Sequence, residues 1–317
     1  MNNPLVTIAI PAFKDVFFEE ALESVLNQTY SEIEVIVLDD FSPYDIASIV
    51  DKYQKVRPIR YIRNERNIGK DNLVGMWNLC HSHAKGEYFV LGADDDVYDC
   101  TFVENLVELS RKYPTCDVFH CRTGVIGNEG ELLSIAQPCC EFETQFELIY
   151  NSIIGDRKQV ISDFMIRNQR LHDVGGFVSF PCCWYSDYAT VFLLAKDGVV
   201  CSPDVLFYWR SSTVNISSDK LRASEKISAV FLFWTWVSSL LERIEPKDRF
   251  DQLYRKALHE RLTAIITRHL SSHLNMLGLK KFCTLLLVET DCKKLGAKNK
   301  FKLFLSRFRH TLARLFN

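Results

Sequence analysis

Short apolar runs alternate with amphipathic segments through the first third of the chain. The apolar runs are rich in β-branched residues, as buried strands are, and cover Leu5 to Pro11, Ile33 to Leu38, Ile59 to Ile62 and Tyr88 to Leu91. The segments between them carry apolar side chains on one face and predict helices over Phe17 to Asn27, Tyr44 to Lys55 and Asn72 to His83. Strands that alternate with helices in this way predict an α/β fold, with a mostly parallel sheet and helices on both faces.

Acidic residues follow two of the predicted strands, at the end where the chain leaves them. Asp39 and Asp40 follow the second strand, and Asp94 to Asp96 follow the fourth. Ligands of parallel sheets bind beyond the carboxyl ends of the strands. We therefore expect both acidic segments to line one cleft together with Pro11 to Phe13, which ends the first strand.

Three consecutive carboxylates repel one another unless a positive group lies among them. A divalent metal such as Mg2+ or Mn2+ suits hard oxygen ligands, and such metals commonly hold the phosphates of a substrate. The alternative is a solvated acidic turn that caps the helix beginning near Thr101, because acidic residues favour helix N-termini. The other segments of the chain decide between the two.

The pattern changes in the rest of the chain. Beyond Tyr113 come shorter strand-like pieces and one further helix, in the segments Val118 to Cys121, Val160 to Ile166, Asp187 to Lys196 and Cys201 to Trp209. From Ser217 onward the sequence is helical, with long amphipathic segments at Leu221 to Arg243 and Phe250 to Leu277. The boundary between the α/β part and this helical region is expected between Asn215 and Asp219.

Composition narrows the class of protein. The 317 residues include 47% hydrophobic and 25% charged residues, as in ordinary soluble globular proteins, and the net charge of -2 gives no overall attraction to nucleic acid. We see no signal peptide at Met1 to Leu5 and no apolar run long enough to span a membrane, so we expect a cytoplasmic protein. Its 11 cysteines are then reduced thiols, and none has the spacing of a zinc site, which favours structural roles.

Five segments of the first part of the chain together resemble family 2 glycosyltransferases of the GT-A fold. They are Val6 to Phe13, Ala21 to Tyr30, Glu34 to Ser42, Asn64 to Gly69 and Gly86 to Asp96. Each is weak alone, but together they occur in the family's order and spacing. The resemblance implies a Rossmann-like GT-A domain over residues 1–216, with a nucleotide-binding half at about 1–100 and an acceptor half at about 101–216. A helical region, 217–317, follows it.

The resemblance implies transfer of a sugar from a nucleotide-sugar donor, expected to be a UDP-sugar, to the hydroxyl of a glycan or lipid-linked glycan acceptor. The anomeric carbon inverts, and the expected role is in the synthesis of cell-surface polysaccharide or glycan. Such a displacement needs a group that neutralises the departing diphosphate and a base that takes the acceptor's proton. The family uses a divalent metal, Mn2+ or Mg2+, for the first task.

On the donor side, the resemblance implies contacts along the predicted rim. The donor-binding residues are Pro11, Ala12, Phe13, Asp39, Asp40, Lys70, Asp94, Asp95 and Arg210, and the expected metal ligands are Asp94 and Asp96. Two alternatives stay open here. Asp39 and Asp40 suit helix capping as well as a base and ribose, and Lys70 suits a solvated surface nearly as well as a phosphate.

On the acceptor side, the resemblance implies that Asp187 is the general base. The family carries an acidic pair at the start of a helix that follows a Gly-Gly-Phe loop, and here Ser186 and Asp187 stand there, after Gly175 to Phe177. Either residue also suits a plain helix cap. Gly176, Trp184 and Tyr185 are the expected acceptor contacts, with aromatic packing in a core as the alternative for the last two.

Two positions depart from the family's pattern. Gly92 stands where many members have the leading Asp of the acidic motif, and Ser212 stands where many have a His that binds metal or diphosphate. The departures support an alternative function, a non-catalytic member of the same fold that binds a sugar nucleotide or acts as a scaffold. A nucleotidyltransferase is less favoured, because no Gly-rich phosphate loop lies near the first strand.

The C-terminal segment Lys293 to Asn317 is basic and amphipathic, and it contains no acidic residue. Basic helices rich in Phe and Leu suit an anionic membrane surface, so we expect peripheral attachment to the inner face of the cytoplasmic membrane. The alternatives are a helix packed on the protein with its basic side in water, or a contact between subunits. Nucleic acid is less favoured, since no base-stacking motif accompanies the charge.

Overall fold

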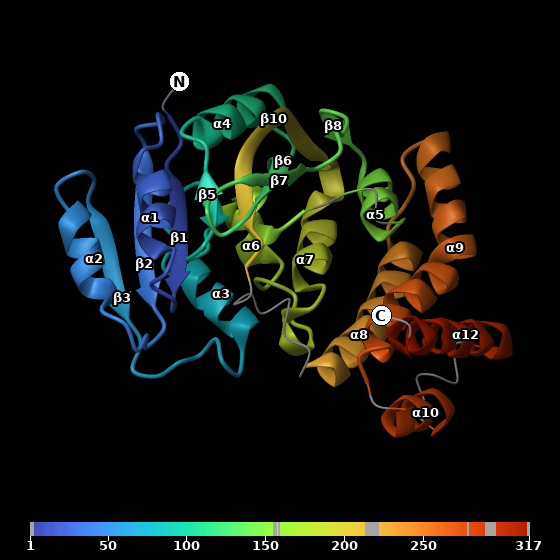
Figure 1. Cartoon of the computed structure of the whole chain (residues 1–317). Coiled ribbons are helices and arrows are strands. Elements are labelled where there is room, and N and C mark those ends of the chain that lie inside the picture. Colours follow the sequence, from blue (N-terminus) through green and yellow to red (C-terminus); the bar gives the residue numbers. More distant parts are fainter. Residues whose placement is uncertain are drawn as a thin grey trace. The chain divides into compact units, whose positions relative to one another are not determined.

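The computed structural model describes residues 3–154, 157, 159–212, 222–277, 279–288 and 296–315 (Figure 1). These residues form two compact units. The sheet unit comprises Met1–Ser179 and Ser186–Thr213, and the helical unit comprises Phe180–Tyr185 and Val214–Asn317. The boundary predicted between Asn215 and Asp219 lies outside the described residues.

The sheet unit follows the predicted alternation of strands and helices, with small shifts at the ends. Its elements are β1 (Val6–Ala12), α1 (Phe18–Leu26), β2 (Ile33–Asp39), α2 (Ile46–Tyr53), β3 (Ile59–Arg63), α3 (Leu73–Ser82), β4 (Tyr88–Leu91), β5 (Val97–Tyr98), α4 (Phe102–Lys112), β6 (Val118–Ile126), β7 (Leu132–Ile135), β8 (Phe142–Glu143), α5 (Gln145–Ile154), β9 (Phe164–Arg167), α6 (Asn168–Asp173), α7 (Ser186–Leu194) and β10 (Val199–Arg210).

The strands form one sheet in the order β3-β2-β1-β4-β9-β6-β10-β5, with β7 paired to β6 and β8 to β10. β1 runs parallel to β2 and β4, and β2 runs parallel to β3, which confirms the parallel sheet predicted for the first part of the chain. The second half is mixed: β9 and β5 run antiparallel to their neighbours, whereas β6 and β10 are parallel.

The strand predicted over Val160 to Ile166 is wrong in its first part. Ile161–Asp163 forms a turn of 3-10 helix, and β9 begins at Phe164. The side chain of Asp163 accepts hydrogen bonds from the Thr123 hydroxyl (2.6 Å) and the Val160 backbone N–H (3.3 Å). These bonds stabilise a local turn instead of an extended strand.

Helices cover both faces of the sheet, because successive strand residues point to opposite sides. On one face, Ile8 and Ile10 of β1 belong to a buried cluster with apolar residues of α1, α2 and α4. On the other face lies α3, and the ring of His81 packs edge-on against Phe89 of β4 at 5.3 Å. The carboxyl ends of β1, β2 and β4 therefore lie at one edge of a sheet that is covered on both sides.

The helical unit contains a 3-10 turn (Pro181–Cys183) and the helices α8 (Ala223–Arg243), α9 (Arg249–Leu274), α10 (Leu279–Val288) and α12 (Gly296–Leu315). The helices α8 and α9 confirm the two long helices predicted there. The ring of Tyr185 stacks on Phe233 of α8 at 4.5 Å, so Phe180–Tyr185 packs within this unit although it precedes α7 in the chain. None of the described helices is both long enough and apolar enough to cross a membrane.

Candidate active site

The ends of β1, β2 and β4 meet at one rim, as predicted from the sequence. The backbone N–H of Asp40 donates to the carbonyl of Ala12 at 2.9 Å. The backbone N–H groups of Phe13 and Lys14 both donate to Oδ2 of Asp94, at 2.9 and 2.8 Å. Asp94 thereby fixes the turn after β1 to the turn after β4, two segments far apart in the sequence.

Asp39 is fully buried at the end of β2. Its carboxylate accepts hydrogen bonds from the Ser42 backbone N–H (2.8 Å), from the Tyr61 hydroxyl (2.5 Å) and from the guanidinium of Arg63. Burial, together with the bond to Asp39, raises the pKa of Tyr61 to about 12, so Tyr61 stays a neutral donor. A carboxylate has about four acceptor sites, which leaves about one of them on Asp39 for a ligand.

Asp40 holds the loop that leads to Lys70. Its carboxylate accepts hydrogen bonds from the Asn64 side chain (2.7 Å) and from the backbone N–H groups of Ile68 (2.8 Å) and Gly69 (2.6 Å). The helix-capping alternative therefore does not describe Asp40, whose observed contacts are with this loop. Lys70 follows the loop with an exposed side chain.

Exposed aromatic side chains lie beside these carboxylates in the chain. Phe13 follows β1 with 38% of its surface exposed, whereas Pro11 and Ala12 lie within the strand. Phe41 is 51% exposed and has a φ of 55°, a left-handed conformation that is rare for a bulky residue and often marks a functional site. The Arg63 guanidinium lies over its ring at 5.3 Å. Sequence reasoning missed Phe41, because backbone conformation cannot be read from a single Phe.

Lys14 lies among the three carboxylates after β4, and the sequence analysis did not identify it. Its Nζ is 3.1 Å from Oδ1 of Asp94 and also contacts the carboxylate of Asp95. Burial opposes a charge on Lys14, but Asp94 and Asp95 outweigh it and raise the pKa of Lys14. Phe13 is a predicted donor contact. The signal that the sequence offered for Lys14 is therefore a basic residue directly after it.

Arg210, at the end of β10, holds the same acidic segment from another side. Its backbone N–H donates to Oδ1 of Asp96 (2.9 Å), and its Nε donates to the carbonyl of Asp95 (2.9 Å). The guanidinium also bonds the carbonyl of Gly127 (3.0 Å) and the carboxylate of Glu20 (2.6 Å), and only 1% of the residue is exposed. The guanidinium predicted to contact the donor's diphosphate is therefore occupied by these partners, and Arg210 positions Asp95 and Asp96 instead.

The acidic segment fits a divalent cation. Three buried carboxylates and one Lys leave a formal charge of about -2, and a buried charge of that size needs compensation. Burial raises the pKa of both Asp94 and Asp96, and the neighbouring charge of Asp95 acts in the same direction. Within the described part of the chain, Oδ2 of Asp96 has no hydrogen-bond partner, so it is available as a metal ligand.

Asp187 lies in the first turn of α7 and is half-buried. Burial raises its pKa to about 6, which makes it a stronger base than an exposed carboxylate and still leaves it ionised near neutral pH. The loop before α7 is attached to this helix by a hydrogen bond from the Val178 backbone N–H to the Thr190 hydroxyl (2.9 Å). The helix therefore presents Asp187 on a fixed backbone.

Gly176 has a φ of 89°, which a side chain would strain. A Cβ at this position would lie 2.4 Å from Oδ1 of Asn78, the atom that accepts the Phe177 backbone N–H at 2.8 Å. The glycine therefore allows the loop to approach α3. It also lines an open cavity of about 540 Å³ together with Asn78, His81, Ser82, Ala84, Asn168, Gln169, His172 and Gly175.

Trp184 and Tyr185 belong to the helical unit, where they make aromatic contacts. The Tyr185 hydroxyl is 2.8 Å from Nδ1 of His269, and Trp184 packs edge-on against His273 at 5.0 Å. The indole N–H of Trp184 is buried and has no hydrogen-bond partner among the described residues. An acceptor contact by these two side chains stays a prediction.

Asp163 is a buried carboxylate that the sequence analysis did not identify. It is fully buried, and its Oδ1 has no hydrogen-bond partner within the described residues. Burial raises its pKa to about 8, and the charge of Asp187 acts in the same direction. Asp163 therefore carries a proton at neutral pH.

Comparison with known proteins identifies the family of the chain. The model of the family described as Glycosyl transferase family 2 matches residues 7–188. A relative from Rickettsia prowazekii, an uncharacterized glycosyltransferase, is 31% identical over 48% of this chain and 49% of its own. A Campylobacter jejuni protein, GalNAc(5)-diNAcBac-PP-undecaprenol beta-1,3-glucosyltransferase, is 34% identical over 29% of this chain and 30% of its own. The chain thus covers half or less of the length of these two relatives.

Solved structures with the same fold cover nearly the whole chain. S. aureus TarS 1-349 in complex with UDP-GlcNAc has a TM-score of 0.66 and 13% identity, covering 98% of this chain and 92% of that chain. A mannosyltransferase from Pyrobaculum calidifontis in complex with GDP-Man and Mn2+ has a TM-score of 0.57 and 16% identity, covering 98% of this chain and 88% of that chain. At this identity the likeness shows the GT-A fold, which confirms the predicted fold class.

The buried proton on Asp163 predicts a pH-dependent stability. The folded protein holds this proton more tightly than the unfolded chain, so the free energy of unfolding falls as pH rises from about 4 to about 8. Asp163→Asn keeps an acceptor for Thr123 and removes this loss of unfolding free energy. The loss is on the order of 1 kcal/mol for each pH unit in that interval. We expect the variant to melt above the wild type at pH 8 and level with it near pH 4. The exposed control Asp173→Asn should change neither, and a pH-independent difference for Asp163→Asn would contradict the assignment.

Proposed function

This chain belongs to glycosyl transferase family 2 and is a glycosyltransferase, and we propose that it moves a sugar from a UDP-sugar donor to an acceptor hydroxyl with inversion. The observation that carries the proposal is the rim on which Asp94 joins the turn after β1 to the acidic segment after β4. Asp187, with its raised pKa, supplies the base on α7 of the same unit.

The nucleotide binds at the ends of β1 and β2. Each of the buried carboxylates Asp39 and Asp40 keeps about one acceptor site for the base or the ribose. The exposed rings of Phe13 and Phe41 offer flat surfaces to a base. UDP-GlcNAc in the TarS structure favours uridine as the nucleoside.

The diphosphate binds at the acidic segment. Asp94 and Asp96 hold a divalent metal, Mn2+ or Mg2+, which neutralises the negative charge of the departing diphosphate when bound. Mn2+ in the structure of the mannosyltransferase supports this choice. Asp95 and Lys14 contact the donor beside it, Lys70 reaches a phosphate, and Arg210 positions Asp95 and Asp96 through the contacts described above.

The acceptor's hydroxyl loses its proton to the Asp187 carboxylate as its oxygen attacks the anomeric carbon from the face opposite the diphosphate. The bond between that carbon and the diphosphate oxygen breaks in the same step, which inverts the configuration. Gly176, Trp184 and Tyr185 contact the acceptor. The acceptor belongs to cell-surface glycan synthesis, and the Campylobacter relative, a glucosyltransferase named for an undecaprenol-linked glycan, supports a lipid-linked one.

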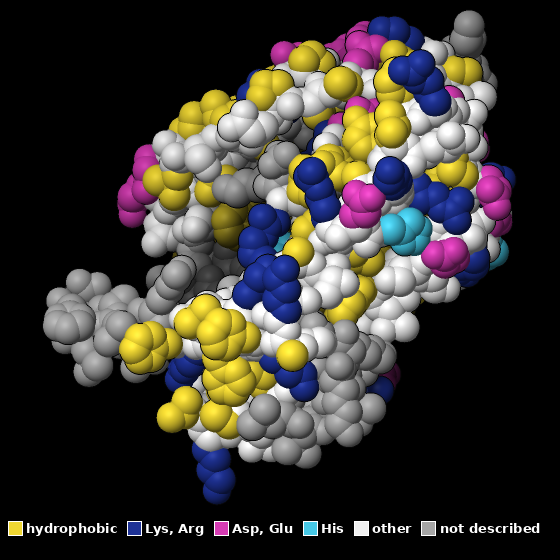
Figure 2. All heavy atoms as spheres, turned by 90° about the vertical axis from the view of Figure 1, so that its right-hand side faces the viewer, with side chains coloured by type: hydrophobic (Ala, Val, Ile, Leu, Met, Phe, Trp, Pro, Cys, Tyr) yellow, Lys and Arg dark blue, Asp and Glu magenta, His cyan; other side chains and the backbone are white. Residues whose placement is uncertain are grey.

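The helix α12 attaches the protein to an anionic membrane surface. Leu303 is buried, and Ser306 is 2.5 Å from Ser271 of α9, so one face of α12 packs on the protein. Phe301, Leu305 and Phe308, spaced as one stripe, are 63%, 40% and 62% exposed. A helix that simply packed its apolar side would bury these residues. Figure 2 shows hydrophobic side chains beside Lys and Arg on the face of this unit turned to the viewer, as membrane-surface helices present them.

One observation favours the alternative function, a non-catalytic protein that binds a sugar nucleotide or acts as a scaffold. Lys14 already pairs with Asp94 and Asp95, where a metal would otherwise be the main compensating charge. In that reading the Lys replaces the metal permanently, and the site binds a nucleotide without turnover.

The role of Asp187 is tested by Asp187→Asn, with UDP release from UDP-GlcNAc, UDP-glucose and UDP-galactose measured in the presence of Mn2+. Loss of the base should lower kcat by about a hundredfold or more and leave UDP binding unchanged. The wild-type rate should fall below about pH 6, where Asp187 takes up a proton, and reach a plateau above it. Asp173→Asn is the control. An unaltered rate in Asp187→Asn would refute the assignment, and UDP binding without turnover of any donor would favour the scaffold.

The metal site is tested by thermal unfolding with UDP, with and without Mn2+. We expect UDP to raise the Tm only when Mn2+ is present, because Asp94 and Asp96 would hold the metal, which would offset their charge and that of the diphosphate. Asp96→Asn keeps an acceptor for the Arg210 N–H but loses a charged ligand, so the UDP shift should vanish. The exposed control Asp71→Asn should keep the shift. A UDP shift that needs no metal would remove the metal from the proposal.

Membrane attachment is tested by replacing Phe301, Leu305 and Phe308 with Ser and measuring co-sedimentation with vesicles. Wild type should bind vesicles rich in phosphatidylglycerol and not those of phosphatidylcholine alone. The triple variant should bind at least about tenfold more weakly, since each buried apolar side chain contributes about 1.5–3 kcal/mol. Leu132→Ser with Leu133→Ser, both 55% exposed in β7, is the matched control. Equal binding by both variants would exclude this surface.

A further inference from the structure

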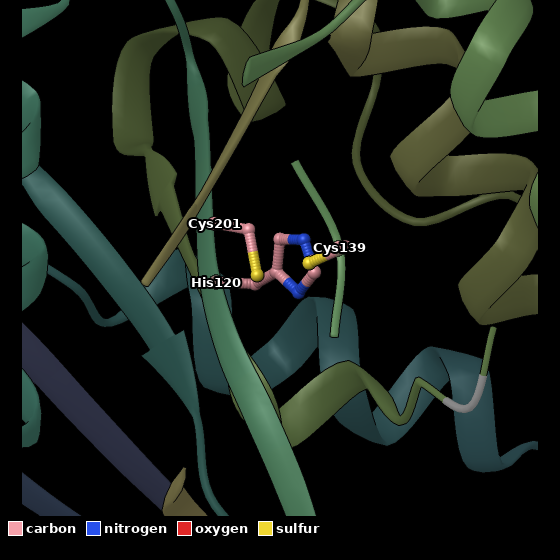
Figure 3. A group of neighbouring side chains, drawn as sticks. All are labelled: His120, Cys139 and Cys201. Carbon is pink, nitrogen blue, oxygen red and sulfur yellow. The ribbon is translucent and has the colours of Figure 1, made fainter. Parts of the chain in front are cut away.

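Three potential metal ligands meet inside the sheet unit, away from the carboxylates of the rim. His120 lies on β6, Cys139 lies between β7 and β8, and Cys201 lies on β10. Their ligand atoms all lie within 4.8 Å of one another, and Figure 3 shows the three side chains converging. His120 and Cys201 are register partners in the parallel ladder of β6 and β10, so their side chains share one face of the sheet.

The imidazole of His120 is prepared to act as a ligand. Its Nδ1 is 3.2 Å from the carbonyl oxygen of Cys121, which only accepts hydrogen bonds, so the ring proton resides on Nδ1. The other nitrogen, Nε2, therefore carries a lone pair. This atom is buried and has no hydrogen-bond partner among the described residues. In metal-binding histidines the N–H of the second ring nitrogen typically donates a hydrogen bond to a carbonyl in this way.

A buried lone pair without a hydrogen-bond partner costs free energy, so Nε2 of His120 requires a partner of another kind. The ring is held in place by stacking on Phe164, with the centroids 4.9 Å apart, and His120 is only 2% exposed. The candidate hydrogen-bond partners for Nε2 are the sulfurs of Cys139 and Cys201, but thiols are poor hydrogen-bond donors. A metal ion bound by all three atoms satisfies the lone pair.

We propose that His120, Cys139 and Cys201 bind one Zn2+ ion, with a water molecule in the fourth position. Zn2+ favours tetrahedral sites of nitrogen and sulfur ligands, at about 2.0 Å from nitrogen and about 2.3 Å from sulfur, so binding would draw the three atoms closer together. Each thiol loses its proton on binding, and the two thiolates then balance the dication. Neutrality favours Zn2+ over Cu+, which would leave a net negative charge in a buried site.

The surroundings fit a neutral site. The charges of Arg157 and Glu143 act on Cys139, and these two side chains form an ion pair with each other and are nearly fully buried. Arg122 also acts on Cys139 and favours its thiolate, the form that binds a metal. Cys139 is only half-buried, so an ion and a water molecule have access from its side. Because the ligands come from three segments, the ion would attach the chain between β7 and β8 to the central strands. This site is independent of the proposed glycosyl transfer.

The test replaces zinc with Co2+ in the reduced full-length protein. A thiolate ligand gives a charge-transfer band in the near ultraviolet, and a tetrahedral site gives strong visible bands, whereas the oxygen ligands of the rim give neither. We expect the bands to saturate at one Co2+ per chain and to be displaced by Zn2+. Cys139→Ser and His120→Gln should abolish or shift them, and Cys140→Ser, the exposed neighbouring thiol, should keep them.

Absence of the charge-transfer band in the reduced wild type would overturn the proposal, as would a band that survives Cys139→Ser. A Cys139–Cys201 disulfide, found by mass spectrometry, together with no Co2+ binding after reduction would also overturn it and assign the pair to redox chemistry. Circular dichroism identifies a variant that fails to fold, and Cys201→Ser then repeats the measurement. As a second readout, a chelator should lower the Tm of the wild type and leave that of Cys139→Ser unchanged.

Discussion

The structure depends on the burial of carboxylates where parallel strands end. A buried carboxylate must be hydrogen-bonded or paired, so each one here joins segments that are distant in sequence. Asp94 accepts the backbone N–H groups of Phe13 and Lys14, and Asp40 accepts those of Ile68 and Gly69. The same bonds that satisfy these charges thereby shape the rim on which the proposed donor binds.

The acidic segment after β4 illustrates how the two halves of the sheet are joined. Arg210 ends β10, and its backbone and guanidinium donate to Asp96 and to the carbonyl of Asp95. Lys14, in the turn after β1, contacts Asp94 and Asp95. Basic groups that follow β1 and end β10, one in each half of the sheet, therefore compensate part of the charge, and the remainder is of the size that one divalent cation balances. Burial makes the remaining charge costly unless such an ion compensates it.

Two further carboxylates of the sheet unit have pKa values raised by burial, with different consequences. Asp187 is half-buried at the start of α7, and a pKa of about 6 suits a group that must be ionised and still accept a proton. Asp163 is fully buried with one unpartnered oxygen, and a pKa of about 8 keeps it neutral. The difference in burial therefore explains why Asp187 suits the role of the proposed base, whereas Asp163 stays protonated.

The sequence alone determined the α/β class, the parallel first half of the sheet and the family. It also determined that Asp40, Asp94 and the end of β1 converge. Hydrophobic periodicity and the position of a residue at a strand end are local or topological properties, so a sequence can encode them.

Tertiary structure decided what each polar side chain contacts. Lys14 was missed and Arg210 was assigned to the diphosphate because charge gives no direction, whereas the fold buries the Arg guanidinium against Glu20 and backbone carbonyls. His120, Cys139 and Cys201 have no recognisable spacing in the chain. They meet only because β6 and β10 pair in register and the segment after β7 returns to them, and side-chain proximity of that kind arises from packing, which no single stretch of sequence encodes.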